Sequence, residues 1–141
     1  MKRHKTLKLA VVALTVMTLV LASAAIALAD PGLGVTVDPT APVSRTGVVT
    51  LTGTVTCDSP MYVYISGQLR QSVGRKTLLQ AYFYSYPWCS GGTTPWSATV
   101  ASSNGVFGGG KAEVYMTVSG CSWYFCESAS VSQTIRLKPT K

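Results

Sequence analysis

The sequence predicts an all-β fold, an immunoglobulin-like antiparallel β-sandwich of about seven strands held by two disulfides. Three observations support this prediction. After residue 30, apolar and polar side chains alternate with a period of two over most of the chain. The same region carries no convincing 3.6-residue apolar stripe of a helix, and it contains all four cysteines. A small closed barrel is the alternative arrangement for so many short strands.

The first 29 residues have the features of an export signal. Residues 9–21 form a nearly unbroken apolar run, preceded by a basic segment with Lys2, Arg3, Lys5 and Lys8. Small residues at positions 27 and 29 suit a signal peptidase. We therefore expect cleavage after Ala29, a single mature domain at 30–141 and a secreted, extracellular location. The alternative is an uncleaved segment, since 9–28 is long enough to span a bilayer and would tether the domain outside.

Seven stretches show the alternation of strands. The clearest is 49–57, whose apolar face consists of Val49, Leu51, Val55 and Cys57, with four threonines on the other face. The other strands are expected at 33–38, 61–67, 78–85, 96–101, 112–118 and 130–137. Residues 70–77 are polar and basic, and we expect them to be a connector between the third and fourth strands.

Four cysteines in a short exported domain indicate two disulfides, for which three pairings are possible. Cys121 and Cys126 enclose only four residues, so we expect them to pair locally and Cys57 to pair with Cys89. The chain-entropy model assigns about 3 to 4 kcal/mol of stability to the longer loop and about 2 kcal/mol to the shorter one. The spacings match no zinc-binding motif.

Composition excludes several classes of function. The whole chain has a net charge of +7, but four of its twelve basic residues belong to the signal, which leaves the mature domain at +3. So mild a bias does not suit a nucleic-acid-binding protein. His4 is the only histidine and also lies in the signal, which removes the usual histidine-dependent catalytic and metal sites from the mature domain. We expect no enzyme, catalytic residue, metal or cofactor.

Two groups of aromatic residues are the candidate binding surfaces. Around the predicted fourth strand, Phe83 should point inward, while the outer face carries Tyr82, Tyr84 and Tyr86. Trp88, just before Cys89, belongs to the same candidate group. Tyr62 and Tyr64 should lie beside them on the neighbouring strand. Exposed rings on a rigid sheet can stack on sugars or anchor a protein. Cross-strand aromatic packing is the alternative interpretation.

The second group is Trp123, Tyr124 and Phe125, in the loop between Cys121 and Cys126. Three consecutive large rings on a short closed loop cannot all point inward easily, so this loop is our first candidate surface. The alternative is that the rings fold over the end of the sandwich and close it.

The segments GVVTLTGTVTC at 47–57 and SQTIRL at 132–137 resemble small secreted immunoglobulin-like domains of actinobacteria, which are mostly uncharacterised. A fainter similarity is to the neocarzinostatin-type chromophore-binding apoproteins, secreted sandwiches in which one disulfide closes a Cys-x4-Cys loop, as Cys121 and Cys126 do. Their other disulfide is short-range, whereas Cys57 and Cys89 lie 32 positions apart. The resemblance therefore implies a secreted β-sandwich and carries over no binding residue.

These features predict a secreted, non-enzymatic binding module at the cell surface or in the medium. Its partner would be a cell-wall glycan or a secreted protein, with no nucleic acid, and with no membrane contact after signal cleavage. One alternative is a small-molecule carrier with an apolar cleft between the sheets. Another is a protease inhibitor that presents Arg70 or Arg75-Lys76 on a loop near the Cys57–Cys89 bridge.

Overall fold

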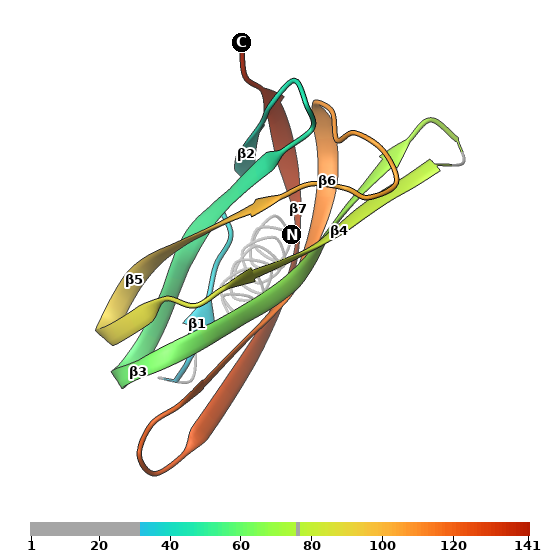
Figure 1. Cartoon of the computed structure of the whole chain (residues 1–141). Helices are drawn as coiled ribbons and strands as arrows, with labels where there is room; N and C mark the ends of the chain where they lie inside the picture. Colours follow the sequence, from blue (N-terminus) through green and yellow to red (C-terminus); the bar gives the residue numbers. More distant parts are fainter. Residues whose placement is uncertain (1–31, 76) are drawn as a thin grey trace, which may run out of the picture. The chain divides into compact units, whose positions relative to one another are not determined.

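The computed structural model describes residues 32–141 apart from position 76, so the predicted export signal and its cleavage at Ala29 lie outside the described residues. Within the described part, no helix is long and apolar enough to cross a membrane. The regular elements there are strands (Figure 1): β1 (Gly34–Val35), β2 (Thr40–Val43), β3 (Val49–Val73), β4 (Thr77–Ser85), β5 (Trp88–Val100), β6 (Gly110–Cys121) and β7 (Cys126–Pro139).

β3 is the central element because its 25 residues contribute to both layers of the fold. Its first part pairs with β5 and, at Val55 and Thr56, with β1. Its second part lies between β4 and β6. The register shifts between Cys57 and Pro60, where the chain turns from one layer into the other (Figure 1). The predicted seven-stranded, immunoglobulin-like sandwich with two disulfides is confirmed.

β2 and β7 form a second connection between the two layers, in addition to β3. β2 joins β3 through the pair Val43 and Val49, and it runs parallel to β7. β6 pairs along its whole length with β7, and it also pairs with β3. A hydrogen-bonded circuit therefore links β3, β2, β7 and β6, and the two layers share one core.

The alternation in the sequence produces this core directly. The predicted inner face of residues 49–57 is fully buried, and Phe83 is buried as predicted. The Phe83 ring stacks on Trp96 with a centroid distance of 6.1 Å, and the Trp96 indole donates a hydrogen bond to the Thr36 carbonyl at 2.9 Å. The outward threonines bond to neighbours instead; the hydroxyls of Thr36 and Thr54 lie 2.7 Å apart.

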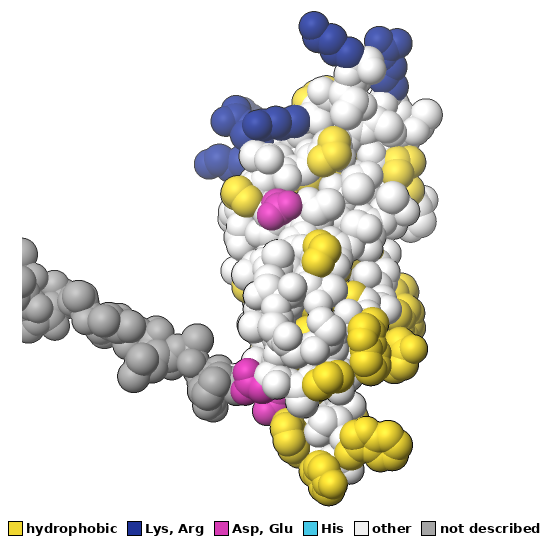
Figure 2. Space-filling view, turned by 90° about the vertical axis from the view of Figure 1, so that its left-hand side faces the viewer, with side chains coloured by type: hydrophobic (Ala, Val, Ile, Leu, Met, Phe, Trp, Pro, Cys, Tyr) yellow, Lys and Arg dark blue, Asp and Glu magenta, His cyan; other side chains and the backbone are white. Residues whose placement is uncertain are grey.

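Basic and hydrophobic side chains gather at different ends of the surface of this domain. On the face shown in Figure 2, hydrophobic side chains gather toward one end, and Lys and Arg side chains gather at the other. The strand register agrees with this distribution. The basic pair Lys111 and Arg136 lies toward one end of the β6–β7 hairpin, and the pair Cys121 and Cys126 lies at the other.

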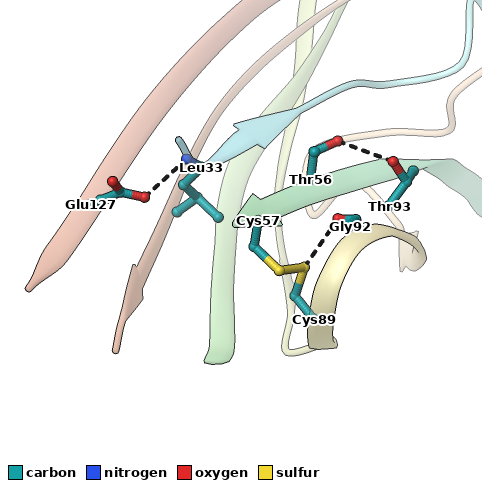
Figure 3. The surroundings of a disulfide bond; sticks show 7 residues. All are labelled: Leu33, Thr56, Cys57, Cys89, Gly92, Thr93 and Glu127. Carbon is teal, nitrogen blue, oxygen red and sulfur yellow. Dashed lines mark hydrogen bonds between the residues drawn. A yellow bond between two sulfur atoms is a disulfide. The ribbon is translucent and has the colours of Figure 1, made fainter. Parts of the chain in front are cut away.

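Both disulfides form as predicted, Cys57 with Cys89 and Cys121 with Cys126. The first is buried at the bend of β3, where the Cys89 sulfur lies 3.5 Å from the Gly92 carbonyl oxygen (Figure 3). Gly92 has a φ of 122°, which lets β5 follow the bend at a backbone geometry that other residues rarely adopt. Nearby, Glu127 accepts a hydrogen bond from the Leu33 backbone at 3.0 Å (Figure 3).

The structure corrects several predicted strand boundaries. The expected strands at 49–57 and 61–67 are one continuous strand, and the expected strand at 33–38 shortens to β1. β5 begins at Trp88, well before the predicted start at 96. β2 was missed because its four residues include a proline and are too few to show a period of two.

The prediction of a connector at 70–77 is wrong. Arg70 to Val73 continue β3 and pair with β4, so the hairpin turns just after Val73, at Gly74 and Arg75. The stretch is polar because Arg70 and Ser72 lie on the outer sheet face, while the buried amide of Gln71 is satisfied by hydrogen bonds to the Gly108 backbone at 2.8 and 2.9 Å. Gly74 has the positive φ of 63° that a tight turn requires.

Candidate functional site

Tyrosine rings cover one side of the outer face of the β4–β3–β6–β7 layer. Tyr82, Tyr84 and Tyr86 are 65%, 58% and 70% exposed, which confirms the predicted outer face. Tyr64 on β3 lies beside them as predicted; its ring centroid is 6.1 Å from that of Tyr84, with nearly parallel planes, and 4.9 Å from that of Tyr86. Cross-strand packing and solvent exposure therefore coexist here, because Tyr84 and Tyr86 contact Tyr64 and are still more than half exposed.

The same face is hollowed beside these rings, with a volume of about 600 Å³. The hollow follows from side-chain size. β4 contributes the large rings of Tyr82 and Tyr84, β7 contributes the small side chains of Ser130 and Ser132, and between them β3 contributes Ser66, Gly67 and Gln68. Tyr115 and Thr117 of β6 complete the lining, and the Thr117 and Ser130 hydroxyls lie 3.1 Å apart. We call this hollow the tyrosine groove.

One end of the tyrosine groove is ordered by a chain of polar contacts. The Arg70 guanidinium lies over the Tyr115 ring, 5.1 Å from its centroid, and Arg70 Nε donates to Gln68 Oε1 at 2.6 Å. The Tyr115 hydroxyl donates to Glu113 Oε2 at 2.7 Å. This hydrogen bond raises the pKa of Tyr115 above its ordinary value, and burial and the negative charge of Glu113 add to the rise, which the charge of Arg70 partly offsets. Tyr115 is thus held in place as a neutral hydroxyl.

Beyond Tyr115, a second hollow of about 370 Å³ continues along the same layer. Its charged lining consists of Arg70, Lys111 and Glu113, with Ser72 and Thr134 as hydroxyl groups. We call it the charged hollow. Arg70 and Thr134 each pair with Glu113 across the sheet, so three adjacent strands contribute to it.

The loop residues Trp123 and Tyr124 are almost fully exposed, at 96% and 95%, and Phe125 is about half exposed. The alternative that these rings close the end of the sandwich is therefore wrong for Trp123 and Tyr124. The tight loop explains why, since Ser122 and Phe125 form a backbone hydrogen bond of 2.8 Å that leaves the two residues between them at the tip. Their role as a binding surface stays a prediction.

Trp123 also approaches the aromatic residues at the bend of β3. It lines a hollow of about 330 Å³ with Tyr62 and Trp88, whose rings meet edge to face at 4.6 Å. The two predicted aromatic groups therefore meet at this end of the domain, while Tyr82 and Tyr84 belong to the tyrosine groove.

The arginines named for a protease inhibitor are not where that hypothesis placed them. Arg70 lies in β3 and lines the charged hollow, so it is not on a loop. Arg75 lies at the turn after β3, separated from Cys57 by most of that strand. Both are therefore remote from the Cys57–Cys89 bridge. Among the described residues, no three His, Cys, Asp or Glu side chains come together as metal ligands.

Sequence reasoning missed the groove itself and Tyr115. The alternation of 112–118 places Tyr115 and Thr117 outward, so a signal for their exposure was present. Their proximity to Tyr82 and Ser132 depends on strand order and register, which alternation does not encode.

No curated protein matches the chain. Among solved structures, it is similar to AggA, the major subunit of aggregative adherence fimbriae type I from Escherichia coli, at 17% identity and a TM-score of 0.42, over 77% of this chain and 95% of that one. It is also similar to the periplasmic chaperone SfaE, at 14% identity and a TM-score of 0.35, over 77% of this chain and 58% of that one. Residues 31–123 match a family of unknown function, DUF6299, and the chain belongs to that family.

Proposed function

We propose that the domain is a secreted, non-enzymatic module that binds a glycan of the cell surface or medium along the tyrosine groove. The observation that carries this proposal is the composition of the groove, with tyrosine rings on one side and hydroxyl and amide groups across from them. Aromatic rings stack on the apolar faces of sugars, and serine, threonine and glutamine side chains can both donate to and accept from sugar hydroxyls.

The size and the setting of the groove support the proposal. A volume of about 600 Å³ lies within the usual range of ligand sites, roughly 300 to 1,000 Å³. The lining residues come from four hydrogen-bonded strands, so little conformational entropy is lost when a ligand binds. Two disulfides indicate an oxidising compartment, which fits a location outside the cytoplasm.

The test is a pull-down of the exported, oxidised protein with insoluble cell walls and polysaccharides. We expect a Tyr82→Ala/Tyr84→Ala variant to lose binding by about ten-fold or more, because two stacking rings contribute roughly 1 to 3 kcal/mol together. A Trp123→Ala/Tyr124→Ala variant is the matched control, since it also removes two exposed rings but leaves the groove intact.

Retained binding in the control and lost binding in the groove variant would support the proposal. The reverse result would move the binding surface to the loop between Cys121 and Cys126, in line with our first sequence hypothesis. If the unmodified protein captures no wall material and no polysaccharide, the glycan proposal is wrong.

Other binding functions would use other parts of the domain. A secreted protein partner would contact the exposed rings of Trp123 and Tyr124. A small-molecule carrier would need an apolar cleft between the layers, where Phe83 and Trp96 stack on each other. A protease inhibitor would present Arg75 at the β3–β4 turn. The groove favours the glycan over these alternatives because its polar and aromatic groups face the same hollow.

A further inference from the structure

We infer that the glycan is an acidic one, and that the charged hollow binds an anionic substituent of a sugar held in the tyrosine groove. This inference rests on the proposed function and adds the ligand class. The anionic group can be a carboxylate, a sulfate or a phosphate, because all three offer the paired oxygens that an arginine recognises.

The two hollows lie next to each other on the same layer. Gln68 and Tyr115 line the groove, Arg70 and Glu113 line the charged hollow, and these four residues are in direct contact or two positions apart on the same strand. Two residues along a strand span about 7 Å. A sugar unit stacked on the tyrosines therefore lies within reach of Arg70 through its own substituent or through that of the next unit.

Arg70 is oriented before any ligand arrives. Its guanidinium lies over the Tyr115 ring, and its Nε is already bonded to Gln68. No ion pair or other side-chain hydrogen bond involves Arg70 within the part of the chain that the structure describes. The terminal nitrogens are thus available for a bidentate contact, and holding the side chain in place lowers the entropy lost on binding.

The charge around Arg70 favours an anion. Lys111 lines the same hollow, and Arg136 is its partner across the β6–β7 pair. Glu113 is the one acid in the lining, and one of its carboxylate oxygens already accepts the Tyr115 hydroxyl. Two cations against one carboxylate leave a net positive site. Glu113 also disfavours an anion placed directly on it, which directs the anionic group toward Arg70 and Lys111.

The experiment compares three polymers with one backbone: dextran, carboxymethyl-dextran and dextran sulfate. We expect the exported protein to bind at least one anionic polymer about ten-fold more tightly than plain dextran, the effect of one good charged contact. The two anionic polymers distinguish a preference for carboxylate from one for sulfate. The Arg70→Gln variant should bring anionic and plain dextran to within about two-fold of each other.

Arg75→Gln is the matched control, because it removes the same charge at the β3–β4 turn, outside both hollows. Preference lost in Arg70→Gln and kept in Arg75→Gln supports the inference. If both variants lose the preference for anionic dextran equally, the inference is wrong, and the polymers are attracted to the basic end of the domain in general. Equal binding of all three polymers by the unmodified protein also overturns it. The glycan proposal is judged separately, by the wall pull-down with the Tyr82→Ala/Tyr84→Ala variant.

Unchanged thermal unfolding of each variant shows that the variant is folded.

Discussion

Gly67 shows how a single residue allows close packing of the core beneath β3. It lies in β3 between β4 and β6, and a Cβ at this position would come within 2.5 Å of the Phe83 ring and 2.7 Å of Met116 Cβ. Any larger residue would therefore push two buried side chains apart. The absence of a side chain lets Phe83 pack beneath β3, directly under the part of β3 whose outer face lines the groove.

Tyr115 allows a prediction of pH dependence. Its pKa is raised, chiefly by the hydrogen bond to Glu113, so the folded state binds this proton more tightly than the unfolded state does. The resulting stabilisation is fully present below the ordinary tyrosine pKa near 10 and is lost as pH rises through the higher folded-state value. The ultraviolet titration difference between the unmodified protein and Tyr115→Phe isolates this group.

A Glu113→Gln variant is the control for that titration. It keeps an oxygen acceptor but removes the negative charge, so the Tyr115 pKa should fall toward its ordinary value. If Tyr115 titrates identically in the unmodified protein and in Glu113→Gln, the conclusion that Glu113 raises the Tyr115 pKa is wrong.

Among the elements, the β6–β7 hairpin carries the more accessible disulfide. Cys121 and Cys126 are exposed at the last paired position of the two strands, whereas Cys57 and Cys89 are fully buried at the bend of β3. The Cys121–Cys126 bridge holds the turn that displays Trp123 and Tyr124. The Cys57–Cys89 bridge joins β3 and β5, the two strands that pass from one layer to the other.

This difference predicts selective reduction. A mild thiol reductant should open Cys121–Cys126 first under native conditions, because a thiolate must reach the sulfur that it attacks. Alkylation followed by mass spectrometry reads the order directly. Replacing both Cys121 and Cys126 by alanine should lower the free energy of unfolding by about 2 kcal/mol, against about 3 to 4 kcal/mol for Cys57 and Cys89. Simultaneous opening of both bridges would show that access does not decide the order.

At the scale of the whole domain, β3 makes the two layers one cooperative unit. Since its two parts belong to different layers, neither layer can separate from the other without breaking pairs along this strand. The closed circuit through β2 and β7 adds a second connection. We therefore expect a single unfolding transition in denaturant with the disulfides intact.

Trp96 provides the probe for this prediction. It is buried, whereas Trp88 and Trp123 are exposed, so a Trp88→Phe/Trp123→Phe variant leaves one fluorescent core reporter. Its fluorescence transition in urea should coincide with the loss of circular dichroism in the far ultraviolet. Two separated midpoints would mean that the layers unfold independently.

The sequence predicted some features of this domain more reliably than others. Alternation predicted the buried face of 49–57 and the inward orientation of Phe83, because side-chain direction in a strand has a strict period of two. It failed at 70–77, where an exposed sheet face has the composition of a loop. It also grouped Trp88 with Tyr82 and Tyr84, although Trp88 lines a hollow with Trp123 and is not part of the groove.

Sequence by itself determined the all-β class, the two disulfides and the residues that face outward, because these properties follow from local period and cysteine spacing. Only the tertiary structure decided that β3 bends through both layers and that Tyr82, Tyr115 and Ser132 line one hollow. These residues are distant in the chain, and they meet through strand order and register. Both of these depend on how the whole set of strands packs, and not on any one segment.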